Sequence, residues 1–148
     1  MEEIVVKEVI TARELREFIY LPEKVHSNDP GWLPPIYMDE KLLFNKKKNK
    51  SYKYADAILM LAWKKGKPMG RIMALVNNRY NEINRESHGR FCFMECYDDR
   101  EVFHALISAA GEYTLDNDLA VNGNLTISNA SGVLNLNGNN ITLSASSV

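Results

Sequence analysis

The first part of the chain shows a strand-like and then a helix-like pattern of apolar residues. A short β-branched run at residues 4–9 predicts a strand. Thr11, followed three residues later by Glu14, forms a capping-box signature, so we expect a helix to begin there. The apolar stripe of this helix consists of Leu15, Phe18 and Ile19. Because proline lacks an amide hydrogen and clashes with the preceding turn, Pro22 should interrupt or restart the helix.

Turns dominate the next segment. Residues 28–35, which read Asn-Asp-Pro-Gly-Trp-Leu-Pro-Pro, predict a turn that leads into an extended stretch. Residues 38–44 predict a short helix, and the lysine-rich residues 45–53 predict a loop.

The clearest pattern is a hairpin followed by a third strand. Two apolar runs, residues 55–63 and 69–76, flank a polar turn with glycine at 64–67, which predicts an antiparallel hairpin. A polar loop at 77–89 then leads to a strand at 90–97. By strict alternation, one face of that strand would carry Phe91, Phe93, Glu95 and Tyr97, and the other Cys92, Met94 and Cys96.

An amphipathic helix should follow the third strand. Carboxylates stand at its start in Asp98-Asp99-Arg100-Glu101. Its buried stripe consists of Val102, Ala105, Leu106, Ala109 and Tyr113. The order of strand, helices, hairpin, strand and helix predicts an α/β (α+β) fold, a mixed sheet with flanking helices.

The end of the chain differs in composition from the rest. All 18 Lys/Arg and 19 Asp/Glu residues fall between Glu2 and Asp118, and the last 30 residues carry no charge. Leu, Ile and Val alternate there with Asn, Ser, Thr and Gly, and Asn-Gly turns separate the apolar pairs. The sequence therefore predicts a domain over residues 1–117 and an Asn/Ser/Gly-rich β segment over 118–148, which resembles β-solenoid or fibre repeats.

Overall composition limits the class of protein. The chain has 148 residues, of which 45% are hydrophobic and 25% charged, with a net charge of -1, as is ordinary for a globular domain. The first residues lack the basic start of a signal peptide, and no apolar run approaches a membrane span. These features predict a cytoplasmic protein without a membrane partner.

The chain has two cysteines, and two of its histidines lie near them in the sequence. Cys92 and Cys96 lie four residues apart in a predicted strand, about 13 Å along an extended chain, which is too far for a disulfide. They are expected to be reduced, buried thiols. Because the same spacing keeps His88, Cys92, Cys96 and His104 from converging on one ion, no metal site is expected.

Basic residues gather in the middle of the chain. Residues 41–71 hold ten of them and one acid, Asp56. The ten are Lys41, Lys46, Lys47, Lys48, Lys50, Lys53, Lys64, Lys65, Lys67 and Arg71. Such a stretch can attract a phosphate or another anion, but a solvated loop plus a polar hairpin turn explains it more simply. No nucleic-acid motif accompanies it, so a nucleic-acid partner is not expected.

Several segments together resemble a group of bacterial proteins with the GCN5-related N-acetyltransferase (GNAT) fold. The segments are 28–35, the hairpin run 55–63, Gly66-Lys67-Pro68-Met69-Gly70-Arg71-Ile72, Asn77-Asn78-Arg79-Tyr80-Asn81 and Phe93-Met94-Glu95-Cys96-Tyr97-Asp98-Asp99. The resemblance covers residues 4 to about 115, the N-terminal portion of longer proteins. It implies an acyl-CoA-dependent N-acyltransferase with acetyl-CoA as cofactor and an amine or other small molecule as acceptor.

The expected cofactor loop is the point where this chain departs from the family pattern. In acetyltransferases of this fold, the strand before the long helix leads into a glycine-rich loop. This loop and the N-terminus of the helix hold the cofactor pyrophosphate. Here the junction, Tyr97-Asp98-Asp99-Arg100-Glu101-Val102, has no glycine and three carboxylates that would repel it. Acetyl-CoA thus follows from the resemblance alone, and the cofactor-binding residues are unknown.

Glu95 is the candidate catalytic residue. Some acetyltransferases carry on this strand a general-base glutamate that takes a proton from an amine through water. The alternative is a partly buried glutamate that pairs across the sheet with Arg71 or Arg90.

Three interpretations of the tail stay open. It is a foreign segment joined by a fusion or frameshift, or it is the family's own continuation, in which residues 119–128 supply the next strand, or it is disordered. In the first case we expect an acyltransferase-like protein that is incomplete and inactive by itself. The alternatives are a binding or assembly module that self-associates through exposed β edges of the tail, and an anion-binding protein that uses residues 41–71.

Overall fold

The computed structural model describes residues 3–114, 118–121 and 141–143, and these form a mixed α/β structure, which confirms the predicted fold class. The sheet has the strand order β1-β2-β3-β4-β5-β6. The first four strands pair antiparallel, whereas β5 and β6 are parallel to their neighbours. In chain order the elements are β1 (Ile4–Glu8), α1 (Ala12–Val25), α2 (Tyr37–Leu43), the 3-10 helix η1 (Lys50–Lys53), β2 (Ala55–Lys64), β3 (Lys67–Asn77), α3 (Asn78–Asn84), β4 (His88–Cys96), α4 (Arg100–Tyr113), β5 (Asp118–Val121) and β6 (Ile141–Leu143).

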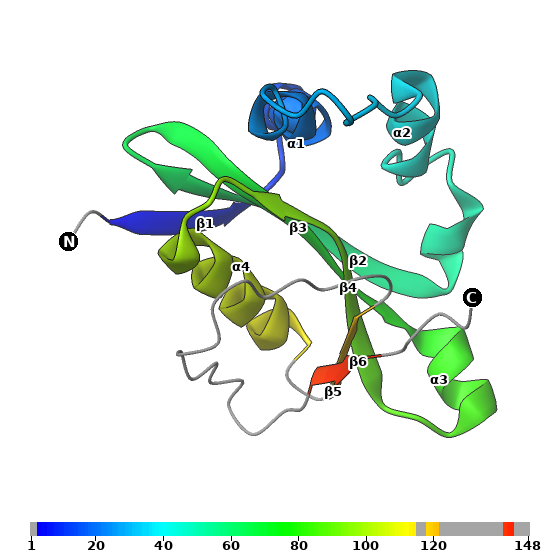
Figure 1. Ribbon diagram of the computed structural model, residues 1–148. Helices are drawn as coiled ribbons and strands as arrows, with labels where there is room; N and C mark the ends of the chain where they lie inside the picture. The colour runs from blue at the N-terminus through cyan, green and yellow to red at the C-terminus, as the bar shows by residue number, and fades with distance from the viewer. Residues whose placement is uncertain (1–2, 115–117, 122–140, 144–148) are drawn as a thin grey trace.

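Helices cover both faces of the sheet, and each face has its own core. Figure 1 shows α4 on one side and α1 with α2 on the other. The core under α4 includes Met60, Ile72, Ala74, Phe91, Val102, Leu106 and Ile107. The core under α1 and α2 includes Phe18, Ile19, Leu21, Phe44, Leu59 and Leu61. The chain thus builds three layers from the apolar stripes of its helices.

The hairpin of β2 and β3 is confirmed at its predicted place. Lys64 pairs with Lys67, and the two residues between them, Lys65 and Gly66, have φ angles of 53° and 72°. Positive φ at both central positions suits the right-handed twist of a two-residue hairpin, and glycine adopts it without steric cost.

A β-bulge in β4 makes the predicted alternation wrong. Cys92 pairs with Met73 and Glu95 pairs with Arg71, so Phe93 and Met94 together lie opposite the single residue between Met73 and Arg71. Phe93 has a φ of 51°, which a bulky residue adopts only under constraint. The extra residue changes which side of the sheet the later side chains face. Phe91 packs in the core under α4, whereas Phe93 and Tyr97 pack in the core under α1.

The segment predicted as a polar loop at 77–89 contains the short helix α3. Its start is capped by Asn77, whose side-chain oxygen accepts a hydrogen bond from the Tyr80 amide at 3.0 Å. Asn81 anchors it to β4, because its side-chain amide donates to the His88 carbonyl at 3.0 Å. Capping and anchoring through asparagines carry no hydrophobic periodicity, and for that reason the apolar pattern missed this helix.

The helix α1 does not stop at Pro22 as predicted but continues to Val25. Its start is the predicted capping box: the Glu14 amide donates to the Thr11 hydroxyl at 3.1 Å, and the Thr11 amide donates to the Glu14 carboxylate at 2.9 Å. Proline within a helix removes one i→i−4 hydrogen bond, here the bond to the Phe18 carbonyl. That carbonyl has a different donor, Arg71, as described below.

Only two short pieces of the predicted tail fall within the described residues. Asp118–Val121 pairs in parallel with His88–Phe91 after the crossover through α4, and β6 pairs in parallel with β5. Residues 118–121 therefore lie where the interpretation as the next strand places them, and the resemblance to a β-solenoid is not supported. Residues 122–140 and 144–148 lie outside the described part of the chain, and the domain boundary after residue 117 stays a prediction.

Gly70 should be required by the packing of α4 on β3. A Cβ atom at this position would lie 2.7 Å from both the Cys96 Cβ and the Leu106 Cδ1. We expect G70A to lower the free energy of unfolding in urea by about 1–3 kcal/mol, because the core must move apart to admit the methyl group. The control is G31A in an exposed turn, where the nearest atom would be 3.3 Å away. Equal stability of G70A and G31A would contradict this account of the packing.

Candidate functional site

A buried arginine on β3 is the centre of the candidate site. Arg71 is only 2% exposed, and its Nη1 donates a hydrogen bond to the Phe18 carbonyl at 2.9 Å. Its guanidinium carbon lies 5.1 Å from the centre of the Phe18 ring and 5.7 Å from that of Phe93. The cation therefore lies between two aromatic side chains, an arrangement that favours a guanidinium over an ammonium group.

The bond to Phe18 depends on the proline in α1. Phe18 precedes Pro22 by four residues, so its carbonyl would be paired with the amide of residue 22 in an ordinary helix. Because proline has no such amide, the carbonyl is free to accept from Arg71. The sequence thus contains both halves of this interaction, the missing donor in α1 and the replacement donor 53 residues away on β3.

Two carboxylates flank the guanidinium. Arg71 Nη2 lies 3.5 Å from the Glu95 Oε2 on β4, and Arg71 Nη1 lies 3.9 Å from the Glu40 Oε2 on α2. The pairing of Glu95 with Arg71 is one of the two partners predicted for it. The other, Arg90, lies instead with its guanidinium carbon 4.4 Å from the centre of the Tyr80 ring. The catalytic role of Glu95 stays a prediction.

Glu40 belongs to the site although the sequence did not indicate it. It is 9% exposed, and it lies four residues before the buried Phe44, on the inner side of α2. Phe44 holds that side in place through edge-on ring contacts with Phe18 and Phe93, at 5.2 Å and 5.0 Å between ring centres. The sequence could have indicated Glu40 only as a charged residue on the apolar side of a predicted helix. Its role can be recognised only when Arg71, its partner across the core, is known.

The charges in this cluster are not balanced. Two carboxylates face one guanidinium, and within the described residues Glu40 Oε2, Glu95 Oε2 and Arg71 Nε are buried without a hydrogen-bond partner. Burial raises the pKa of Glu40 above its ordinary value; Arg71 opposes this shift and Glu95 adds to it. Burial also lowers the pKa of Arg71, while the charges of Glu95 and Glu40 raise it. A guanidinium stays protonated in proteins, so the cluster can accept a further positive charge or proton.

Glu95 is the more accessible of the two carboxylates. Its side chain is 30% exposed, against 11% for Glu40. It stands two residues after Phe93, whose positive φ marks the bulge of β4. A bulge leaves backbone groups outside the hydrogen-bond ladder and redirects side chains, and such bulges are frequent beside active sites. Glu95 thus combines a fixed position with access from outside.

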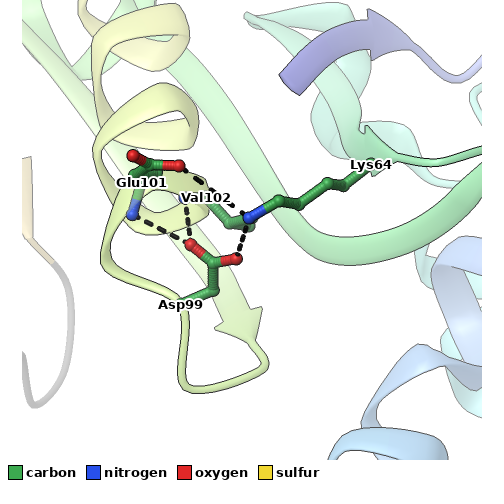
Figure 2. A network of polar contacts seen from close by, with 4 residues as sticks. All are labelled: Lys64, Asp99, Glu101 and Val102. Carbon is green, nitrogen blue, oxygen red and sulfur yellow. Dashed lines mark hydrogen bonds and ion pairs between the residues drawn. The ribbon is translucent and has the colours of Figure 1, made fainter. Parts of the chain in front are cut away.

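The N-terminus of α4 is closed to an anion by the chain's own carboxylate. Figure 2 shows Asp99 Oδ1 accepting from the amides of Glu101 and Val102, at 3.1 Å and 3.2 Å. Lys64 Nζ lies 2.7 Å from Asp99 Oδ2 and 3.8 Å from Glu101 Oε2. The pKa of Asp99 is lowered, first by the hydrogen bond from Lys64 and also by the two amides. These amides are the groups that would hold a pyrophosphate, so the residues here do not fit that part of acetyl-CoA.

The basic stretch does not form one surface. Arg71 is buried in the cluster described above, and Lys64 is bound to Asp99. Exposed side chains remain over the first part of the stretch: Lys41, Lys46, Lys47, Lys48, Lys50 and Lys53.

The two cysteines and the two histidines near them in the sequence each have their own surroundings. Cys92 and Cys96 are free, and burial raises the pKa of each to about 11, so neither is a thiolate at neutral pH. His88 Nδ1 lies 3.2 Å from the Glu86 carboxylate, and His104 Nε2 accepts from Arg100 Nε at 3.3 Å. Within the described ranges, no group of three or more His, Cys, Asp or Glu side chains is placed to hold a metal ion.

Solved structures with the same fold are acetyltransferases. A tandem GNAT protein from the clavulanic acid biosynthesis pathway aligns over 92% of this chain and 41% of its own, with a TM-score of 0.60 and 14% identity. An aminoglycoside acetyltransferase from an uncultured soil metagenomic sample, solved with sisomicin, aligns over 82% of this chain and 78% of its own, with a TM-score of 0.53 and 13% identity. The chain has the GNAT fold.

Two curated proteins are similar in sequence. A bacterial ceramide synthase from Caulobacter vibrioides is 31% identical over 106 residues, which is 71% of this chain. Protein YghO from Escherichia coli is 30% identical over 108 residues, also 71% of this chain. This GNAT-fold chain spans only 28% and 27% of the length of these relatives. No family model matches it.

The coupling between Arg71 and Pro22 can be measured directly. We expect R71M to lower the free energy of unfolding by about 3–5 kcal/mol, because it leaves the buried Glu40 and the half-buried Glu95 without a cation and the Phe18 carbonyl without a donor. P22A should raise the stability of R71M more than that of the wild type, by about 1–3 kcal/mol, since alanine restores the missing helical amide. Chemical denaturation of the four proteins gives the coupling, with P34A as the control proline. If the effects of R71M and P22A on the free energy of unfolding are additive, Arg71 does not replace the missing amide as donor to the Phe18 carbonyl.

The pH dependence of stability should report on Glu40. Its folded-state pKa is raised above the ordinary value of 4.5, so folding takes up a proton in this range. The contribution of Glu40 to stability is therefore complete below pH 4.5 and is lost as pH rises through the raised pKa. We expect the unfolding free energy of the wild type to fall relative to that of E40Q over this window, measured by urea denaturation at each pH. The control is E112Q, an exposed glutamate on α4, which should follow the wild type. An unfolding free energy of the wild type that stays parallel to that of E40Q, or rises relative to it, as pH increases would contradict the assignment.

Proposed function

We propose that this chain forms the amine-acceptor side of an acyl-CoA-dependent N-acyltransferase, with Glu95 as the general base. The observation that supports this most is the position of Glu95. It is held beside Arg71, 3.5 Å from Nη2, it follows the bulge of β4, and its side chain is 30% exposed. A base in acyl transfer must combine a fixed position with access to the acceptor.

The cluster has the chemistry of a site for a protonated amine. Glu40 and Glu95 carry two negative charges against the single charge of Arg71, so an ammonium group meets a net negative field. Only the neutral amine attacks an acyl group, so a proton must leave it first. Glu95 takes that proton, directly or through one water, while Arg71 keeps the carboxylate in place and Glu40 supports the acceptor charge.

Two of the similar proteins have names that point to an amine as acceptor. A ceramide is an amide of a long-chain amino alcohol, and an aminoglycoside acetyltransferase modifies an amino sugar. Both reactions acylate an amine. Because the sequence similarity is to the ceramide synthase, a long-chain amino alcohol is the first acceptor to test.

The donor is not assigned to residues of this chain. Asp99 occupies the two amides at the start of α4, and with Glu101 it makes that end negative. An acyl-CoA used by the whole protein would therefore need to place its pyrophosphate elsewhere. In agreement with this, we expect acetyl-CoA to give no saturable heat with this chain in isothermal titration.

The acceptor site is tested by titration with a water-soluble 2-amino alcohol that carries an octyl chain. We expect saturable binding to the wild type and roughly tenfold weaker binding to E95Q, because one of the two carboxylates that face the ammonium loses its charge. The matched control is E112Q, which should bind like the wild type. Where the longer relatives can be assayed for amide formation, the variant that corresponds to E95Q should lower the rate by about 10²–10⁴-fold. Equal binding by E95Q and E112Q would contradict the role of Glu95, and saturable acetyl-CoA binding would contradict the closed end of α4.

A further inference from the structure

The helix α2 exposes several apolar side chains although it buries a glutamate, which is unusual for a surface helix. Glu40 and Phe44 face the core, whereas Met38 and Leu42, four residues apart, are 74% and 47% exposed. An ordinary surface helix buries its apolar stripe and exposes its charges. The outer side of α2 therefore needs an explanation beyond the packing of this domain.

More exposed apolar side chains lie next to α2 along the chain. Just before the helix, Leu33 is 83% exposed and Ile36 is 68% exposed, and at its end Leu43 is 40% exposed. Single exposed apolar residues are common, but five within eleven consecutive residues form a concentrated patch. Figure 1 shows α2 at the periphery of the molecule, on the face of the sheet opposite α4.

A cluster of lysines is fixed against the end of the same helix. The Asn49 side-chain amide donates to the Leu43 carbonyl at 2.8 Å, and the Asn45 side chain accepts from the amides of Lys47 and Lys48. These bonds fold the lysine turn back onto the C-terminus of α2. The exposed lysines of the segment are Lys41, Lys46, Lys47, Lys48, Lys50 and Lys53.

The charge of this segment is one-sided. From residue 41 to residue 55 there is no acid, and within residues 33–53 the exposed acid is Asp39. Glu23 on α1 accepts a hydrogen bond from the Tyr37 hydroxyl. Over the described part of the chain, no ion pair holds these six lysines, although Lys41 lies 5.7 Å from the centre of the Tyr20 ring. Some of them suit the negative end of the α2 dipole, but six exceed what one short helix needs.

We propose that the exposed apolar residues and lysines of segment 33–53 bind the surface of an anionic lipid bilayer. Apolar side chains that enter the headgroup boundary, next to lysines that pair with anionic headgroups, are the two elements of interfacial binding. A nucleic acid would use the lysines but not the aliphatic side chains, which lack the aromatic rings that stack on bases. Within the described ranges no helix is long and apolar enough to cross a bilayer, so the contact is with its surface. This departs from the absence of a membrane partner predicted from composition.

The proposal does not depend on the acyl transfer, but it uses the same helix. The inner side of α2 carries Glu40 to the cluster around Arg71, and its outer side carries Met38 and Leu42. Contact of the outer side with a bilayer would hold the candidate site next to the membrane surface.

Binding is tested by co-sedimentation with vesicles, using phosphatidylcholine alone and an equal mixture of phosphatidylcholine and phosphatidylglycerol. We expect the chain to sediment with the mixed vesicles and not with phosphatidylcholine alone, and to be released as salt is added. The variant K46S/K47S/K48S should bind roughly a hundredfold more weakly, at about fivefold for each lysine. M38S/L42S should bind at least about tenfold more weakly, because it removes two inserted side chains.

Matched control variants distinguish binding through this surface from nonspecific binding to vesicles. I83S replaces an apolar residue that is 69% exposed on α3, and K67S replaces an exposed lysine on β3. Both should bind like the wild type, and circular dichroism should show that all variants fold. The proposal is overturned by an absence of vesicle binding, by equal loss in the controls, or by a dimer in light scattering that M38S/L42S abolishes. A nucleic-acid site would give a different result. The wild type and M38S/L42S would then bind single-stranded nucleic acid, the lysine variant would not, and none of them would bind vesicles; this outcome would also overturn the proposal.

Discussion

A guanidinium group buried between two layers is the interaction on which this structure depends. Arg71 binds a carbonyl of α1, lies beside a carboxylate of α2 and another of β4, and separates two aromatic rings. A cation removed from water is costly unless its partners are in place, so the packing of these elements must keep those partners beside it. The proline in α1 takes part in this arrangement, because it leaves the Phe18 carbonyl available to the arginine.

The same constraint gives the domain its chemical asymmetry. On the α1 side of the sheet, two carboxylates meet one cation, and Glu95 stays accessible beside the bulge of β4. At the start of α4, by contrast, Asp99 binds the amides of Glu101 and Val102 as well as Lys64. Burying a charge is costly unless it is paired and hydrogen-bonded. The α1 side of the sheet thus keeps one partly exposed carboxylate, Glu95, while two amides at the start of α4 are occupied by Asp99.

Local patterns predicted those parts that local interactions stabilise. The capping box of Thr11 and Glu14 and the β2–β3 hairpin were identified from the sequence, and both are confirmed. The predicted buried stripe of α4 is confirmed at Val102 and Leu106 but is wrong at Tyr113, which is 38% exposed. The errors occurred where a distant residue decides the outcome. The bulge at Phe93 shifted the face of Phe91, and a donor from β3 let α1 continue through Pro22. Of the site, Glu95 and its partner Arg71 were predicted, whereas Glu40 was not, because a buried glutamate has meaning only beside its counter-ion.

The sequence by itself determined the order of strands and helices, the resemblance to a GNAT fold, and the unsuitability of the α4 start for a pyrophosphate. These properties depend on neighbours within a few positions along the chain, whose spacing can be read directly. Only the tertiary structure decided which charges meet, which side chains of β4 face each core, and that the apolar side of α2 points outward next to six exposed lysines. The physical reason is that burial and charge pairing depend on contacts across the sheet, between residues whose separation along the chain carries no periodic signal.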